Sequence, residues 1–249
     1  MITVRNIWKA FDAGPVLRGV NIDVQEEETL VVLGKSGCGK SVLLKTIIGL
    51  IQPDAGTVTV DGSELGGLTY RQLRELRCKF GFLFQGAALF DSLTVEENIA
   101  LPLQRDRAKS ENQIRERVRA ALELVGLGPI ERAMPASLSG GMKKRVGLAR
   151  AIAPNPRYVL YDEPTTGLDV ETADGISLLI NDLRTTLGVT SIVVTHDIHS
   201  AFLVGDRFAI LDGGVTVATG TREEIQKSED EKVRKYINSS LPKEKRDKR

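Results

Sequence analysis

Eight consecutive residues near the N-terminus have the types and spacing needed to bind phosphate. They form the pattern G-x-x-x-x-G-K-[ST] and read Gly34, Lys35, Ser36, Gly37, Cys38, Gly39, Lys40 and Ser41. Glycines let backbone N–H groups turn toward an anion, and a following helix start adds partial positive charge. The Lys40 ammonium then reaches the terminal phosphates, and the Ser41 hydroxyl can ligate Mg²⁺. This phosphate loop predicts binding of a nucleoside triphosphate with Mg²⁺.

Two carboxylates follow a second apolar run, at residues 158–161. Asp162 stands where that predicted strand would leave the sheet, a position suited to holding Mg²⁺ or its water. Glu163 could then polarise the attacking water. Acidic residues at the end of a strand are often only solvated. Here a phosphate loop occurs in the same chain, which favours the catalytic interpretation.

A second candidate anion site precedes a predicted helix at residues 143–153. Ser139 is well placed as the N-cap of that helix, and Gly140 and Gly141 expose backbone N–H groups at its start. Taken alone, Ser-Gly-Gly would indicate an ordinary capped helix. One chain therefore offers one full set of phosphate, metal and carboxylate groups, but two candidate anion-binding helix starts.

These groups must be positioned by an alternation of strands and helices. Apolar runs at 2–4, 20–24, 29–33 and 57–60 predict strands in the first part of the chain, as do 80–84, 158–161, 190–195 and 208–211 further on. Helix-like spacing covers 95–126 and 170–187, and another helix is expected to begin near Asp197. We expect an α/β fold with a mostly parallel core sheet, an antiparallel β part and an inserted helical lobe at about 87–155.

Composition sets limits on the class of protein. The 249 residues are 41% hydrophobic and 27% charged, with a net charge of +1, which favours neither nucleic acid nor an acidic substrate as partner. No apolar run approaches the roughly 20 residues needed to span a bilayer, and a secretory signal is not expected. Two cysteines argue against a disulfide framework. The tail at 243–249 carries five basic residues, which predicts a solvated end or weak attraction to an anionic membrane.

The ordered motifs resemble those of the ATP-binding-cassette (ABC) ATPases over nearly the whole chain. The resemblance rests on the phosphate loop, Gln85 after the 80–84 strand, Leu138–Met142, Leu160–Glu163, residues 165–169, and His196 after the 192–195 strand. It implies that Phe11 stacks on the adenine of ATP, with Trp8 as the weaker candidate. It further implies that Gln85 contacts Mg²⁺ and the attacking water, that Glu163 is the catalytic carboxylate, and that His196 senses the γ-phosphate. His199 matches no family position and is expected to be structural.

The resemblance also implies an assembly and a division of the chain. The Ser139 helix start would face ATP bound by a second copy, giving a head-to-tail dimer with two composite sites. A catalytic core lobe is expected at about 1–86 and 156–220, with the helical lobe at about 87–155, within one domain over 1–237. Residues 238–249 would form a basic tail.

Residues outside the hydrolysis motifs resemble those of one subfamily of cassette ATPases. The signature ends in Met142 where the family most often has Gln, and this feature resembles the ATPase subunit of the Mla (Mce-type) phospholipid transport systems, as do the 86–103 stretch and the 229–237 ending. The implied partners are a membrane permease, a periplasmic Mce-domain lipid-binding subunit and a small regulatory subunit, at the cytoplasmic face of a bacterial inner membrane. An apolar run at 87–90 could line a groove for a permease helix or simply pack inside the helical lobe.

Three other interpretations compete with this one. An importer of small polar solutes such as amino acids would carry the same hydrolysis motifs. A cassette protein acting on DNA or ribosomes usually carries a long coiled coil or a second cassette, for which 249 residues leave no room. A scaffold gated by nucleotide without turnover is disfavoured because Lys40, Asp162, Glu163 and His196 are all present.

Overall fold

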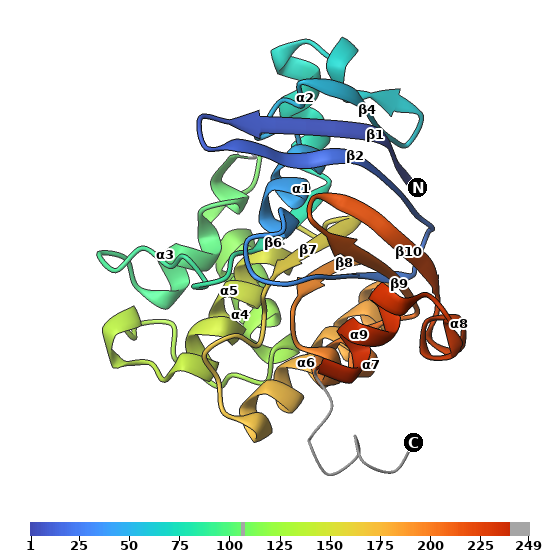
Figure 1. Cartoon of the computed structure of the whole chain (residues 1–249). Coiled ribbons are helices and arrows are strands. Elements are labelled where there is room, and N and C mark those ends of the chain that lie inside the picture. The colour runs from blue at the N-terminus through green and yellow to red at the C-terminus, as the bar shows by residue number, and fades with distance from the viewer. Residues whose placement is uncertain (106–107, 240–249) are drawn as a thin grey trace. The chain divides into compact units, whose positions relative to one another are not determined.

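The computed structural model describes residues 1–105 and 108–239 of the chain (Figure 1). The chain divides into two compact units: the first joins Met1–Leu73 to Ile192–Arg249, and the second is Arg74–Ser191. The predicted basic tail lies almost wholly outside the described residues, and the predicted lobe boundaries stay a prediction. None of the helices in the described ranges is long and apolar enough to cross a bilayer.

The first unit contains an antiparallel sheet with strand order β2-β1-β4-β5. Its strands are β1 (Ile2–Phe11), β2 (Gly14–Val24), β4 (Ala55–Val60) and β5 (Ser63–Glu64). Apolar side chains recur along β1 and β2 on the buried face, as expected for a sheet with one covered face. β1 shifts register where Asn6 adopts φ 49°. A Cβ at Gly56 would collide with the Asn6 carbonyl oxygen, so only glycine lets β4 pass this irregularity.

A second sheet of the first unit carries the phosphate loop. It contains β3 (Thr29–Leu33), β9 (Arg207–Asp212), β10 (Val215–Thr221) and the end of β8 (Thr190–Thr195). β3 runs parallel to β9, and β9 runs antiparallel to β10. Every residue of β3 is buried, the pattern of a parallel strand covered on both faces. The helices of this unit are α1 (Lys40–Ile47), α7 (Ile198–Val204), α8 (Arg222–Lys227) and α9 (Glu231–Ser239).

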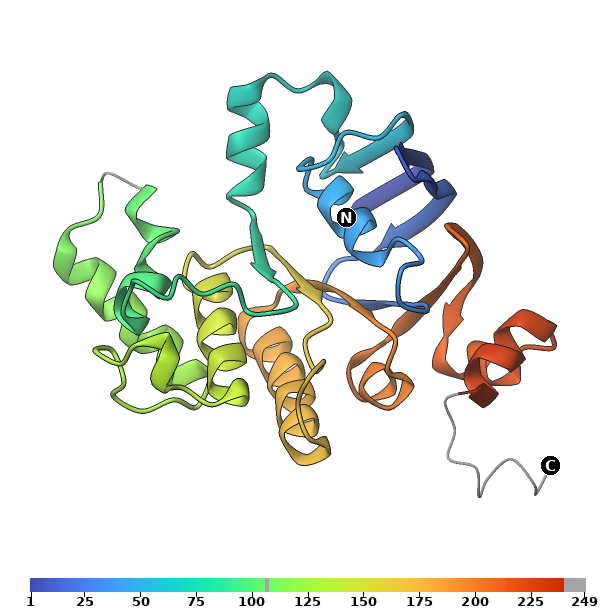
Figure 2. The ribbon, with the colours of Figure 1, turned by 60° about the vertical axis from the view of Figure 1, so that its left-hand side comes forward.

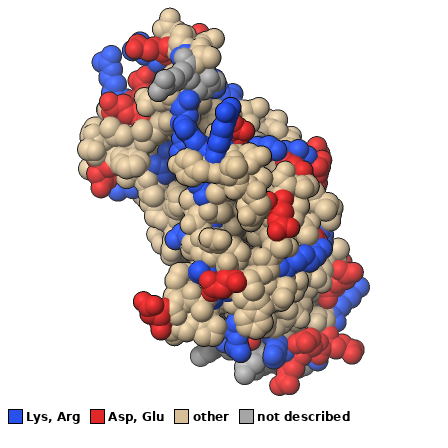
Figure 3. All heavy atoms as spheres, turned by 90° about the horizontal axis from the view of Figure 1, so that it is seen from above, with Lys and Arg blue, Asp and Glu red and all other residues tan. Residues whose placement is uncertain are grey.

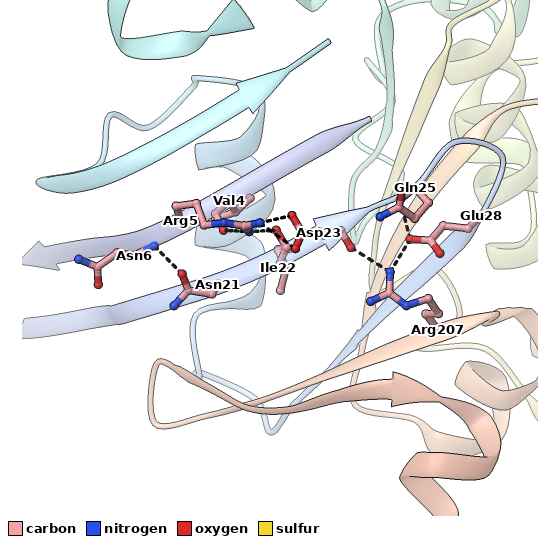
Figure 4. Close-up of polar contacts among 9 residues, drawn as sticks. All are labelled: Val4, Arg5, Asn6, Asn21, Ile22, Asp23, Gln25, Glu28 and Arg207. Carbon is pink, nitrogen blue, oxygen red and sulfur yellow. Dashed lines mark hydrogen bonds and ion pairs between the residues drawn. The ribbon is translucent and has the colours of Figure 1, made fainter. Parts of the chain in front are cut away.

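A polar network joins the two sheets of the first unit (Figure 4). The Arg207 guanidinium donates to the Asp23 carbonyl oxygen at 3.4 Å and pairs with Glu28 at 3.2 Å. On the opposite side of Asp23, its carboxylate pairs with Arg5 at 2.7 Å. The end of β2 is thereby tied both to β1 and to β9.

The second unit consists mainly of helices around two parallel strands. β6 (Phe80–Leu83) pairs with β7 (Tyr158–Asp162). The helices are α3 (Val95–Ala100), α4 (Glu111–Leu124), α5 (Gly140–Ile152) and α6 (Val170–Leu187), and α2 (Tyr70–Arg77) crosses the boundary between the units. In Figure 2, α5 and α6 lie side by side. α5 also packs closely on β6. The approach is so close that a Cβ at Gly81 would collide with the Ala151 carbonyl oxygen.

The helical pattern predicted over 95–126 is divided in the structure. α3 ends at Ala100, and α4 begins only at Glu111. Pro102 cannot continue a helix hydrogen-bond ladder, and Ser110 starts a new helix through a capping box with Gln113. The predicted 170–187 helix, the predicted N-cap Ser139 and the helix start predicted near Asp197 are found as expected, and Asp197 is the N-cap of α7.

Charged side chains are mixed on the surface. On the face seen in Figure 3, basic and acidic groups both occur among a larger area of other residues. This pattern accords with the net charge of +1.

Candidate nucleotide site

The phosphate loop lies between the buried strand β3 and the start of α1. Gly37 has φ 81° and Gly39 has φ 104°, values that residues with a Cβ rarely adopt. A Cβ at Gly34 would collide with the Cys38 sulfur and stand 2.6 Å from the Leu211 carbonyl oxygen. Gly34 and Gly39 are buried, whereas Lys35, Ser36 and Gly37 are exposed at the tip. The glycines therefore permit a tight turn of the loop backbone, and the tip of the loop stays accessible.

Lys40 holds its ammonium against the loop. Its Nζ donates to the carbonyl oxygens of Gly34 at 2.7 Å and Lys35 at 3.1 Å, and the residue is buried. Ser41 follows in the first turn of α1. This arrangement fits a phosphate chain with its Mg²⁺. The Lys40 ammonium and the glycine N–H groups suit the phosphates, and the Ser41 hydroxyl oxygen suits the metal ion.

Cys38 sits in the loop and is half-buried. Burial raises the pKa of its thiol, and this effect exceeds the opposing attraction of the Lys40 ammonium for the thiolate. The thiol is therefore a weaker nucleophile near neutral pH than an ordinary cysteine.

The two aromatic candidates for adenine stacking differ in their contacts. Phe11 ends β1, is 47% exposed, and has the Lys9 ammonium 5.5 Å from its ring centroid. Asp54 holds that ammonium at 2.7 Å. Trp8 donates its indole N–H to the Asn6 side chain at 3.0 Å and packs against Gly19. Both rings are accessible. Phe11 carries no polar ring atom, whereas the Trp8 indole N–H needs a hydrogen-bond acceptor.

His196 follows β8 in the first unit, as predicted, and is exposed. Its carbonyl oxygen accepts a hydrogen bond of 3.5 Å from the Tyr236 hydroxyl on α9. The next residue, Asp197, caps α7 by accepting from the backbone N–H groups of His199 and Ser200. Sequence reasoning missed Tyr236, because nothing in a short C-terminal helix indicates that it reaches His196.

The paired carboxylates lie in the second unit at the end of β7, and both are buried. Glu163 adopts φ 49°, a left-handed conformation that is unusual for a residue with a long side chain. Its carboxylate accepts from the Thr166 hydroxyl at 3.0 Å, and its carbonyl oxygen accepts from the Lys144 ammonium at 3.1 Å. The neighbours therefore fix both ends of the residue proposed to activate water.

Gln85 follows β6 in the same unit, with an exposed side chain. Its carbonyl oxygen accepts a hydrogen bond from the Lys144 ammonium. The loop continues through Ala87 at φ 60° and Ala88 at φ 46°. Arg150 donates to both of their carbonyl oxygens, at 2.6 and 2.7 Å. Sequence reasoning overlooked Lys144 and Arg150 because both look like ordinary basic positions of a helix.

The Ser139 helix start has the predicted geometry. Ser139 is the N-cap of α5 and accepts from the backbone N–H of Met142 at 3.3 Å. Gly140 and Gly141 form the first turn, and a Cβ at Gly141 would stand 2.6 Å from a Thr172 methyl carbon. Glycine at 141 thus lets α5 approach α6 closely, and the exposed Ser139 and Gly140 leave the helix start accessible.

Comparisons with known proteins agree with these motifs. The family model described as ABC transporter matches residues 17–166. The chain is 39% identical over 237 residues to a Mycobacterium leprae protein named "Probable ribonucleotide transport ATP-binding protein mkl", covering 95% of this chain and 68% of that protein. It is 40% identical over 221 residues to "Methionine import ATP-binding protein MetN" of Mesorhizobium japonicum, covering 88% of this chain and only 60% of that protein.

Solved structures agree as well. The dimeric post-hydrolysis ATP-binding cassette MJ0796, bound to ADP and Pi, matches with a TM-score of 0.82 and 35% identity, over 89% of this chain and 98% of that chain. CbiO1 of Clostridium perfringens matches with a TM-score of 0.82 and 28% identity, over 97% and 95% of the two chains. The α/β cassette fold expected from the sequence is thereby confirmed.

Proposed function

Because this chain belongs to the ABC transporter family and carries its ATPase domain, which binds ATP with Mg²⁺, we propose that it is the ATP-hydrolysing subunit of a phospholipid transporter. In this proposal it moves phospholipids between the inner and outer membranes. It acts through a permease and a Mce-domain protein, from the cytoplasmic face of the bacterial inner membrane. A small regulatory subunit completes the complex.

The proposal of ATP hydrolysis rests mainly on the accessible phosphate loop, with Lys40 buried at its base. We assign Lys40 to the terminal phosphates, Phe11 to adenine and His196 to the γ-phosphate. Ser41, Gln85 and Asp162 supply oxygen ligands for Mg²⁺, which neutralises charge on the phosphates when bound. Glu163 accepts the proton of the attacking water.

A head-to-tail dimer accounts for the second anion-binding helix start. ABC ATPases dimerise and pair with membrane permease subunits, and the solved relative MJ0796 is dimeric. We propose that Ser139, Gly140 and Gly141 of one copy face the ATP held by the phosphate loop of the other. The exposure of Ser139 and Gly140 supports this role.

The proposed permease contact lies in the segment at 87–90, in which Ala87 is buried and Phe90 is exposed. Phe90 is 56% exposed, although its backbone is firmly held. The buried Asn98 side chain accepts from the Phe90 N–H at 2.8 Å and donates to its carbonyl oxygen at 3.1 Å. A rigidly presented apolar side chain close in sequence to Gln85 suits a docked permease helix.

The lipid substrate is proposed from Met142 and the 86–103 stretch, which resemble the Mla type. A second candidate is an importer of small polar solutes, favoured by the 40% identity to the methionine import protein MetN. To decide between them, the chain is purified with the products of neighbouring genes, and bound small molecules are identified by mass spectrometry. A Mce-domain partner with phospholipid supports the proposal, and a solute-binding protein with a bound amino acid contradicts it.

Hydrolysis and dimer formation are tested together by Glu163→Gln. This variant keeps the size of the side chain and one acceptor oxygen, but its amide cannot accept the proton. We expect a loss of ATP turnover on the order of 10²-fold or more, and a dimer that persists with MgATP in size-exclusion chromatography. The double variant with Lys40→Ala is the control, since it should not dimerise. Wild-type turnover by Glu163→Gln would contradict the assignment of Glu163.

A further inference from the structure

Lys144 is a buried cation that the proposed mechanism does not use. It lies in the second turn of α5, and only 5% of the residue is exposed. Burying an ammonium is costly unless hydrogen bonds and opposite charges replace its water. Burial lowers the pKa of Lys144, while Asp162 and Glu163 act in the opposite direction by favouring its charged form. These two carboxylates are also the candidate metal ligand and the candidate base.

The hydrogen bonds of Lys144 join two segments that are remote in sequence. Its ammonium donates to the carbonyl oxygen of Gln85 and, at 3.1 Å, to that of Glu163. Both acceptors are backbone carbonyl oxygens, so these two bonds do not involve the side chains of Gln85 and Glu163. One cation therefore sets the backbone position of both residues.

The rest of α5 reinforces this connection. Arg150 holds the carbonyl oxygens of Ala87 and Ala88, in a conformation that alanine rarely adopts. Between the two cations, Gly147 allows close packing, because a Cβ there would stand 2.7 Å from Leu83 and 3.2 Å from Ala87. The segment after β6 is thus fastened to α5 at several points, whereas Glu163 is joined to α5 through Lys144.

We propose that Lys144 is a positioning residue that makes the Gln85 segment and Glu163 move together. The inference rests on the proposed function, in which Gln85 responds to the permease and Glu163 activates water. A displacement of the Gln85 segment then shifts Glu163 relative to the attacking water. Ser139 is the N-cap of the same helix, so closure of the dimer on that helix start reaches Glu163 through Lys144.

The test compares Lys144→Met with Lys143→Met, its half-buried neighbour. Both variants remove one ammonium and keep a long unbranched side chain. On the full chain in its copurified complex, we expect Lys144→Met to lower kcat for MgATP by about 10- to 100-fold. The KM for ATP should stay within about threefold, because the phosphate loop is intact. Lys143→Met should change both constants by less than about twofold.

A second measurement reports position without hydrolysis. Amide hydrogen exchange at residues 85–88 should be faster in Lys144→Met and unchanged in Lys143→Met. Lys144→Arg, which keeps the charge and the donors, should restore part of kcat. If Lys144→Met does not fold, as judged by its thermal unfolding, both measurements are made on Lys144→Gln, which retains two N–H donors.

The outcomes separate this inference from the proposed function. Loss of turnover in Glu163→Gln with wild-type kcat in Lys144→Met would overturn the inference alone. A lowered kcat without faster exchange at 85–88, or an equal loss in Lys143→Met, would also overturn it. Full turnover by Glu163→Gln would instead overturn the role of Glu163 in the proposed function.

Discussion

The residues of the phosphate loop have separate physical roles that single substitutions can distinguish. Gly34 is required by space, because a Cβ would strike Cys38, whereas Gly37 is required by its positive φ, since a Cβ there would meet nothing within 4 Å. Lys40 supplies charge and is already held against two loop carbonyl oxygens. The loop is therefore shaped by its own sequence before any phosphate binds.

Cys38 offers a chemical probe of this loop. Since burial raises the pKa of its thiol, its alkylation should be slow at pH 7 and should still accelerate as the pH rises past the ordinary thiol range. In a Cys78→Ser variant, where Cys38 is the only cysteine left, iodoacetamide labelling is followed by mass spectrometry. MgATP should slow the labelling. Labelling of Cys78 in a Cys38→Ser variant should not respond to MgATP. A rate that levels off below pH 8, or no protection, would contradict this prediction.

Among the elements, the boundaries of the helices in the second unit are set by side chains at their first turns. Thr94 and Glu97 form one capping box, and Ser110 and Gln113 form another. Asn98, inside α3, extends this control to the preceding loop through its bonds to Phe90, Leu93 and Thr94. The position of α3 and the position of the Phe90 backbone are therefore coupled through Asn98.

Replacing Asn98 with Ala should destabilise the protein and loosen this loop. The substitution leaves one backbone N–H and three carbonyl oxygens without the amide that now pairs with them, so we expect a loss of about 2–3 kcal/mol in the free energy of unfolding. Asn112→Ala, on the exposed part of α4, should cost less than about 0.5 kcal/mol. Urea unfolding monitored by circular dichroism measures both. Equal effects of the two substitutions would show that the Asn98 bonds do not stabilise the fold.

At the scale of the whole molecule, each unit has its own core and its own share of the proposed site. Phe11, the phosphate loop and His196 belong to the first unit, and Gln85, the Ser139 helix start and the 162–163 carboxylates belong to the second. Exposed carboxylates held by hydrogen bonds also occur in both: Asp54 in the first, Glu97 and Asp169 in the second.

These carboxylates predict how stability depends on pH across the molecule. Hydrogen bonds lower the pKa of all three: from Lys9 and the Ala10 N–H for Asp54, from Thr94 for Glu97, and from Thr172 for Asp169. Their contribution is therefore complete above the unfolded-state pKa of about 4 and is lost as the pH falls through the lower folded-state values. The free energy of unfolding should fall in that acid range.

A combined variant tests this pH dependence. Asp54→Asn with Glu97→Gln and Asp169→Asn should be less stable than the wild type at pH 6, with a smaller further loss toward acid pH. Lys9→Met should reduce the acid-dependent loss in part, because it removes the largest cause of the Asp54 shift. Curves of unfolding free energy against pH that stay parallel for all variants would contradict the prediction.

The sequence by itself determined the features that depend on nearest neighbours along the chain. The phosphate loop, the N-cap Ser139, the helix start near Asp197 and the buried β3 are each encoded within a few residues, because turn geometry, capping and burial patterns are local. The tertiary structure alone decided that Lys144 bonds Gln85, 59 residues away, that Arg150 holds Ala87 and Ala88, and that Tyr236 reaches His196. A buried hydrogen bond between remote segments depends on how close packing brings their backbones together, and no local pattern specifies that distance.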